Sequence, residues 1–97
     1  MTVTKENIKN IIRENREVLE KYSVKYIALF GSYARDEQEA GSDADFLVEF
    51  EKPTFRNYMG FLSEMKRLLN GNVDIVCKDA LHKRIAPYIL KEAEELI

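Results

Sequence analysis

The spacing of hydrophobic positions changes along this chain, and each change predicts a new element. From Thr4 to Tyr22 apolar residues recur every three or four positions, which indicates one amphipathic helix with Thr4 as its N-cap. Residues 54–69 repeat this spacing behind Thr54 and end at Asn70-Gly71-Asn72, a typical helix stop. The apolar stripes of the two helices are Ile8, Ile11, Ile12, Val18, Leu19 and Tyr22 in the first, and Tyr58, Phe61, Leu62, Met65, Leu68 and Leu69 in the second.

Three shorter apolar runs are typical of strands. Residues 24–30 hold five consecutive apolar side chains, which favours burial on both faces, and residues 43–50 and 73–77 are predicted as two further strands. From residue 79 to residue 96 the spacing is helical again, and Pro87 predicts a break or a fresh helix start near it. This order of elements predicts an α/β (α+β) fold, with a small sheet covered by helices.

Two glycine-serine pairs interrupt the pattern between the first two strands. Gly31-Ser32 ends the first strand, and residues 33–37 are predicted as a short helix capped by Ser32. Gly41-Ser42 marks a turn before the second strand.

Length, charge and cysteine content narrow the class of protein. The 97 residues suit a single domain over 1–97, and the formal net charge of −2 lacks the basic surplus of a free-standing nucleic-acid binder. Cys77 is the only cysteine, so no disulfide within the chain or cysteine-rich zinc site is expected. No run approaches the roughly 18 apolar residues of a membrane helix, and the N-terminus lacks a signal-peptide core. We therefore expect a cytoplasmic protein without membrane contact.

The first Gly-Ser pair suits a phosphate. Glycine lets the backbone approach a ligand closely, and free N–H groups at a helix start attract anions, so Gly31 and Ser32 could hold a triphosphate. Taken alone, however, Gly-Ser is also a common turn. Arg35 could reach the same phosphates or could pair with Glu39 on the surface, and the sequence leaves both readings open.

Three carboxylates, of which the later two stand inside apolar runs, suit a metal ion. Alternate residues of a strand face the same way, so Asp43 and Asp45 would project together, roughly 6.5 to 7 Å apart, and could bind one Mg²⁺ or bridge two. Asp74 could share the metal and draw a proton from an attacking hydroxyl. The alternative is that Asp43 follows a turn, Asp45 is a solvated edge residue and Asp74 points into solvent.

Together these residues resemble the signature of the DNA polymerase beta-type nucleotidyltransferases. Gly31-Ser32, ten residues, Asp43-Ala44-Asp45 and later Asp74 follow its order, and the stretch Leu29–Arg35 is similar to the stand-alone minimal nucleotidyltransferases (MNT). The resemblance implies the nucleotidyltransferase fold with a mixed sheet, Gly31 and Ser32 at the nucleotide phosphates, Asp43 and Asp45 as Mg²⁺ ligands, and Asp74 as the third carboxylate. Two departures are Asp36, where the family often has glycine, and Ala44, where it usually has a bulky aliphatic residue.

The resemblance also implies a reaction. Minimal nucleotidyltransferases are often the antitoxins of HEPN-domain toxins, and they transfer AMP from ATP to a hydroxyl of the toxin, typically tyrosine. We therefore expect ATP as substrate, Mg²⁺ (two ions) as cofactor and a HEPN toxin as partner, with the oligomeric state left open. The alternatives are a non-catalytic antitoxin that neutralises its partner by binding, and a subunit that acts on a small molecule or an RNA end.

Overall fold

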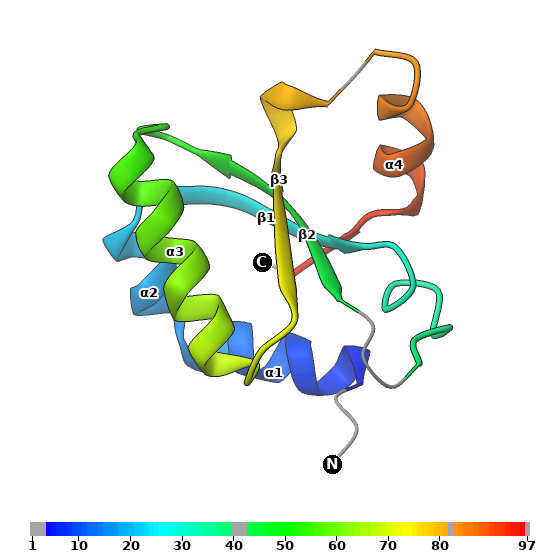
Figure 1. Ribbon diagram of the computed structural model, residues 1–97, viewed down its shortest axis with the longest axis horizontal. Helices are drawn as coiled ribbons and strands as arrows, with labels where there is room; N and C mark the ends of the chain where they lie inside the picture. The colour runs from blue at the N-terminus through cyan, green and yellow to red at the C-terminus, as the bar shows by residue number, and fades with distance from the viewer. Residues whose placement is uncertain (1–3, 40–42, 82, 97) are drawn as a thin grey trace.

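The computed structural model describes residues 4–39, 43–81 and 83–96, which form helices on one side of a sheet and a separate C-terminal helix on the other (Figure 1). The predicted turn at Gly41-Ser42 lies outside the described residues. The elements in order are α1 (Lys5–Glu14), α2 (Arg16–Lys21), β1 (Val24–Phe30), β2 (Ala44–Phe50), α3 (Phe55–Leu68), β3 (Val73–Cys77), η1 (Lys78–Ala80), α4 (Ala86–Glu92) and β4 (Glu94–Glu95).

The strands form one mixed sheet in the order β3-β2-β1-β4. β1 pairs antiparallel with both β2 and β4, whereas β2 and β3 run parallel. The parallel pair is joined through α3, as a parallel connection requires a crossover. The predicted fold class, a small mixed sheet covered by helices, is confirmed.

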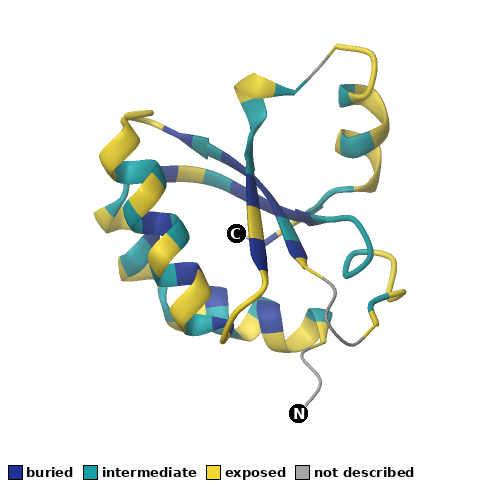
Figure 2. Cartoon of the chain, viewed as in Figure 1, coloured by how far each residue is buried: buried dark blue, intermediate teal, exposed yellow. Residues whose placement is uncertain are grey.

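The hydrophobic core lies between one face of the sheet and helices α1 to α3 (Figure 2). Phe46 and Val48 of β2 are fully buried there, together with Ile8 of α1 and Phe61 of α3. Because successive side chains of a strand point to opposite faces, Asp45 and the residues in step with it face away from these helices. The packing of the core thus decides which face of the sheet carries the carboxylates.

Both threonine caps are confirmed. The Thr4 side chain accepts a hydrogen bond from the backbone N–H of Asn7 at 3.2 Å, and the Asn7 side chain accepts one from the Thr4 N–H at 3.1 Å. Thr54 accepts from the N–H of Asn57 at 3.1 Å. These reciprocal and single caps satisfy N–H groups that the first helical turn leaves without a partner.

The prediction of one continuous helix from Thr4 to Tyr22 is wrong. The helix breaks at Asn15, whose backbone (φ −121°, ψ 37°) is not helical and whose side-chain amide donates to the Ile11 carbonyl at 2.8 Å. Asparagine competes for backbone hydrogen bonds in this way, which explains why the apolar spacing continues across the break while the helix does not.

The short helix predicted over residues 33–37 is also wrong, because the segment forms a single turn that ends at once. The N–H of Asp36 donates to the Tyr33 carbonyl and that of Glu37 to the Ser32 carbonyl, the two bonds of a Schellman motif. Asp36 takes the left-handed conformation (φ +55°) that terminates a helix there. Glycine favours this conformation, which accounts for the glycine expected at this position from the family resemblance.

The C-terminal segment combines one correct and one wrong prediction. α4 starts beside Pro87, as predicted, with the proline in its first turn. The helical spacing does not continue to Leu96, however, because Ala93 is extended and Glu94–Glu95 pair with β1. Leu96 then becomes buried, and its N–H donates to the Ile27 carbonyl at 3.0 Å. Pairing with the free edge of β1 and burial of Leu96 stabilise the extended conformation more than the local apolar spacing stabilises a helix.

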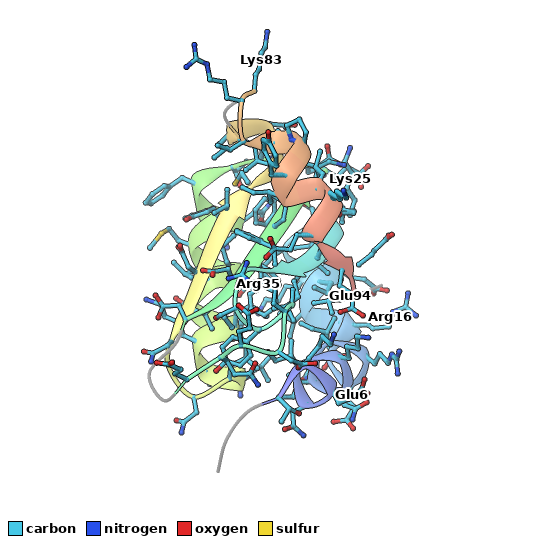
Figure 3. The ribbon with its side chains drawn as sticks, turned by 90° about the vertical axis from the view of Figure 1, so that its right-hand side faces the viewer. Glu6, Arg16, Lys25, Arg35, Lys83 and Glu94 are labelled. Carbon is cyan, nitrogen blue, oxygen red and sulfur yellow. The ribbon has the colours of Figure 1, made fainter. Side chains whose placement is uncertain are left out.

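Glu94 fastens this short strand to the first helix. Its carboxylate pairs with Lys5 at 3.2 Å and with Lys9 at 2.7 Å. Arg35 and Glu94 both lie on the side of the molecule that carries α4 (Figure 3). Within the described part of the chain, no helix has the length and apolar character to cross a membrane.

Candidate functional site

The parallel pairing of β2 and β3 brings two of the predicted carboxylates together. Asp45 is the direct cross-strand partner of Asp74, flanked by the pairs Ala44↔Val73 and Phe46↔Ile75. Paired residues of neighbouring strands face the same way with backbones about 4.8 Å apart, so the two carboxylates share one face. Asp43 precedes β2 by one residue and is in step with Asp45.

The position of Asp45 argues against a solvated edge residue. β2 is an inner strand of the sheet, with β1 on one side and β3 on the other, and Asp45 is half-buried. Asp43 and Asp74 are exposed at the ends of their strands. One constrained carboxylate therefore lies between two that are free to rotate.

Burial and negative neighbours raise the pKa of Asp45. Desolvation is the largest cause, followed by the charges of Asp74 and Asp43, while Arg35 acts in the opposite direction. A carboxylate crowded in this way is costly to ionise unless a cation offsets the repulsion. The electrostatics thus match the donor set of a hard divalent cation such as Mg²⁺.

The carboxylates are neighbours, but their oxygens do not converge on one point. In residues 4–39, 43–81 and 83–96 no three Asp, Glu, His or Cys side chains are gathered closely enough to hold a metal ion. Repulsion between three uncompensated charges favours splayed rotamers, and exposed Asp43 and Asp74 can turn inward at little cost. The residues fit Mg²⁺ by type and by strand position, with side-chain rotation needed for full coordination.

Gly31 sits against these carboxylates because of its conformation and its size. It follows Phe30, which pairs with Asp45 across β1 and β2, and its φ is +75°. A Cβ atom at residue 31 would stand 2.5 Å from Oδ2 of Asp45, closer than real Cβ contacts allow. Both the left-handed backbone and the close approach require glycine, so the backbone of Gly31 lies directly against the Asp45 carboxylate.

Arg35 is the positive member of the site. It donates from Nε to Glu37 at 3.0 Å and from Nη1 to Glu92, and these two carboxylates raise its pKa. Its charge also lowers the pKa of Asp45, so it lies within electrostatic reach of the carboxylates. Ser32 stands between Gly31 and the turn, with its carbonyl accepting from the Glu37 N–H at 2.8 Å. The corner therefore presents one cation and one backbone donor beside the three aspartates.

Glu92 is a member of this site that the sequence did not indicate. It is the last residue of α4, and its Oε1 accepts from the Gly31 N–H at 3.0 Å as well as from Arg35. It is some sixty residues from its partners in the chain and belongs to no motif. Only the return of the C-terminal segment to the edge of β1 could have revealed it.

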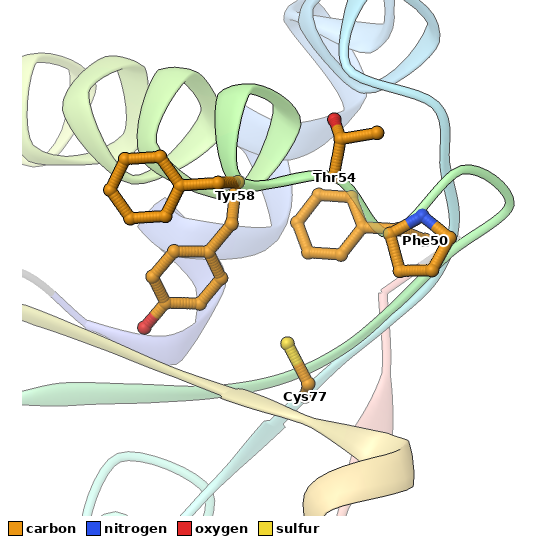
Figure 4. Close-up of a pocket in the computed structure, with 6 residues that line it drawn as sticks. Phe50, Thr54, Tyr58 and Cys77 are labelled. Carbon is orange, nitrogen blue, oxygen red and sulfur yellow. The ribbon is translucent and has the colours of Figure 1, made fainter.

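A hollow lies elsewhere on the molecule (Figure 4). It has a volume of about 250 Å³, and its lining includes Tyr58 and Cys77. Cys77 is three residues beyond Asp74 on β3, about 10 Å further along the strand, so this hollow is separate from the carboxylates. Burial raises the pKa of the Cys77 thiol, and Tyr58 donates to the Ile75 carbonyl at 3.2 Å, as expected for structural side chains.

Comparisons with known proteins agree with this geometry. A model of the nucleotidyltransferase domain family matches residues 8–96. A Methanocaldococcus jannaschii protein whose name assigns it to the protein adenylyltransferases is 42% identical over 96 residues, covering 95% of this chain and 93% of the relative. The match therefore covers nearly all of both sequences.

Solved structures share the fold. The structure of a minimal nucleotidyltransferase superposes with a TM-score of 0.82 at 28% identity and covers 94% of each chain. A tri-AMPylated Shewanella oneidensis HEPN toxin in complex with an MNT antitoxin gives a TM-score of 0.66 at 16% identity, covering 97% of this chain and 72% of that one. At that identity the second likeness concerns the fold alone.

Proposed function

Since the chain belongs to the nucleotidyltransferase domain family, and within it to the minimal nucleotidyltransferases, we propose that it transfers AMP from ATP to a hydroxyl of a partner protein. The single observation that supports this most is the cross-strand pair Asp45–Asp74 beside the glycine corner at Gly31. That arrangement sets metal-binding oxygens next to a phosphate-binding backbone, which is what transfer at an α-phosphorus needs.

The phosphates are bound by the corner. The Gly31 N–H, the Ser32 hydroxyl and the Arg35 guanidinium bind the β and γ phosphates, and Arg35 contributes charge that a neutral donor lacks. Because Gly31 lies against Asp45, a triphosphate held there has its α-phosphate directed towards the aspartates. The left-handed conformation of Gly31 thus determines where the triphosphate lies.

The aspartates hold the metal and the proton. Asp43 and Asp45 would hold one or two Mg²⁺ ions, which would neutralise charge at the reacting phosphate. Asp74 accepts the proton of the attacking hydroxyl. The hydroxyl oxygen forms a bond to the α-phosphorus, the bond between that phosphorus and the α–β bridging oxygen breaks, and pyrophosphate leaves.

The acceptor in this proposal is a tyrosine of a HEPN-domain toxin, in the cytoplasm. Two findings support a protein acceptor: the name of the 42% identical relative, and the AMP-carrying HEPN toxin in the complex of similar fold. Modification of the toxin would make this chain an enzymatic antitoxin.

The test measures transfer of labelled AMP from ATP to the partner protein. The full-length protein is incubated with Mg²⁺, α-labelled ATP and a HEPN-domain protein from the same organism, in parallel with Asp45→Asn and Glu49→Gln. Glu49 lies on the same strand as Asp45 but pairs with Lys25, so it is a matched control of equal charge change. We expect label on the partner with wild type and Glu49→Gln, and at least about a 100-fold lower rate with Asp45→Asn.

Two results would contradict the proposal. If Asp45→Asn transferred label at the wild-type rate, the carboxylates would have no role in the reaction. Neutralisation of the toxin by all three proteins with no label on it would identify the chain as a binding antitoxin instead.

A further inference from the structure

A single carboxylate oxygen accepts hydrogen bonds from both Gly31 and Arg35, two of the donors proposed to bind phosphate. Oε1 of Glu92 accepts from the Gly31 N–H at 3.0 Å and from Nη1 of Arg35. These are a backbone donor and a guanidinium converging on one negative oxygen, which is how proteins commonly hold a phosphate oxygen. The position of Oε1 therefore marks an anion site between Gly31 and Arg35.

We propose that Glu92 occupies the place of a nucleotide phosphate oxygen and that a triphosphate must displace it in order to bind. This inference rests on the proposed function for the identity of the ligand. The donors are shared, and two anions cannot use the same N–H and the same guanidinium face at once. Glu92 thus sets the affinity of the site for nucleotide.

Little apolar surface has to be exposed for Glu92 to leave. α4 has no buried residue among the described ones (Figure 2). Its side chains Tyr88 and Leu90 are 75% and 42% exposed, and Ile85, which precedes the helix, is 50% exposed. The Glu92 side chain is itself 32% exposed and has three rotatable bonds. Its departure therefore costs mainly the two hydrogen bonds, which a phosphate oxygen replaces.

The release can stay local because the chain is fastened again just beyond Glu92. Glu94 pairs with Lys5 and Lys9, and Leu96 is buried against the core. Movement of Glu92 then frees Nη1 of Arg35 without detaching β4. When a site is open for only part of the time, the apparent dissociation constant rises by the inverse of the open fraction.

The experiment uses inorganic triphosphate, which reports on the anion site without depending on a base or an acceptor. The backbone amide resonance of Gly31 is followed in the ¹⁵N-labelled full-length protein while triphosphate is added. Wild type is compared with Glu92→Gln and with Glu95→Gln, which changes the charge equally on β4, where Glu95 is the cross-strand partner of Ala28. Binding of Mg²⁺–ATP is measured on the same three proteins.

We expect Glu92→Gln to bind triphosphate and Mg²⁺–ATP about 5- to 10-fold more tightly than wild type, because an amide oxygen holds Arg35 less strongly than a carboxylate. Glu95→Gln should stay within about twofold. Equal or weaker triphosphate binding by Glu92→Gln would overturn the inference, as would a Gly31 amide that responds to triphosphate in neither protein.

The outcomes separate this inference from the proposed function. Tighter triphosphate binding by Glu92→Gln without any AMP transfer by wild type would keep the inference and remove the reaction. AMP transfer by wild type with unchanged triphosphate affinity in Glu92→Gln would do the reverse.

Discussion

The central sheet and the C-terminal segment 86–96 meet at the same site but are held in place by different forces. β1 to β3 are fixed by buried side chains, among them Phe46, Ile27 and Leu29 at 0% exposure. In α4, by contrast, no described residue is buried, and the segment is attached through Leu96, a two-residue strand and charged side chains. The sheet therefore sets the geometry of the aspartates, while the segment can respond to ions and ligands.

The charged attachments of the segment are arranged in two places. Glu92 contacts Gly31 and Arg35 at the corner, and Glu94 contacts Lys5 and Lys9 on α1. Hydrogen bonds from Lys9 and Lys5 lower the pKa of Glu94. Such attachments weaken in salt and in acid, whereas apolar burial does not, and this difference can be tested.

The largest loss of stability is expected from a substitution in the buried core of the sheet. Phe46→Ala removes a fully buried ring from β2, next to Asp45, and should lower the free energy of unfolding by about 3–5 kcal/mol. Urea unfolding followed by circular dichroism measures this loss. The matched change in the segment is Tyr88→Ala, at a side chain 75% exposed, which should cost less than about 0.5 kcal/mol.

Equal costs for these two aromatic deletions would contradict the comparison. They would mean that α4 packs as firmly as the sheet does.

An intermediate effect is expected at the carboxylates themselves. Because the pKa of Asp45 is raised in the folded protein, the fold binds a proton there more tightly than the unfolded chain, and stability falls as pH rises above the unfolded value near 3.8. At pH 7 without divalent cations, Asp45→Asn should therefore unfold at a temperature about 2–5 °C higher than wild type.

The same melting experiment tests the direction of the pH dependence and the effect of Mg²⁺. The difference should shrink as pH falls towards 3.8, and it should also shrink when Mg²⁺ stabilises the wild type alone. An Asn variant less stable than wild type at pH 7 in chelator would show that the Asp45 charge is already compensated.

The smallest effect is expected from the attachment of β4. Glu94→Gln should lower the melting temperature by about 1–3 °C at low salt, because it weakens the contacts to Lys5 and Lys9. The lowered pKa means that this stability is present above the unfolded value near 4.5 and is lost as pH falls through the folded value. Hydrogen exchange at the Leu96 amide should become faster in the variant.

Glu64→Gln serves as the control for that exchange measurement. Glu64 pairs with Arg67 at 2.6 Å on the surface of α3, away from the segment. It should leave Leu96 exchange unchanged, and in 1 M salt the Glu94 and Glu64 variants should melt alike. Persistent loss of Leu96 protection in high salt would show that the Glu94 contacts are not simply electrostatic.

The strands β1 to β3 and the two threonine caps were predictable because their causes are local. The apolar run of residues 24–30 coincides with β1, and Thr54 caps α3 as expected. The predicted strand 43–50 became β2 one residue later, at Ala44. The helix at 33–37 failed because one left-handed residue, Asp36, stops it after a single turn.

The aspartates illustrate what kind of site information a sequence carries. Alternation placed Asp43 and Asp45 in step, the chemistry of their side chains and backbone indicated Gly31, Ser32 and Asp74, and the family resemblance agreed with all five. The structure places Gly31 and Asp74 next to Asp45. Their assigned roles remain predictions for the labelling and binding experiments. How closely the carboxylates gather was not predictable, since repulsion between side chains depends on their spacing in three dimensions.

The amino-acid sequence by itself determined the three main strands, the two threonine caps and the spacing of Asp43 and Asp45, because these depend on neighbours within a few residues. Only the tertiary structure decided that Asp74 lies directly opposite Asp45 and that Glu92 reaches Gly31 and Arg35. Strand register and the return of the C-terminal segment follow from which surfaces can be buried together. That choice is made by the whole chain, so no local pattern encodes it.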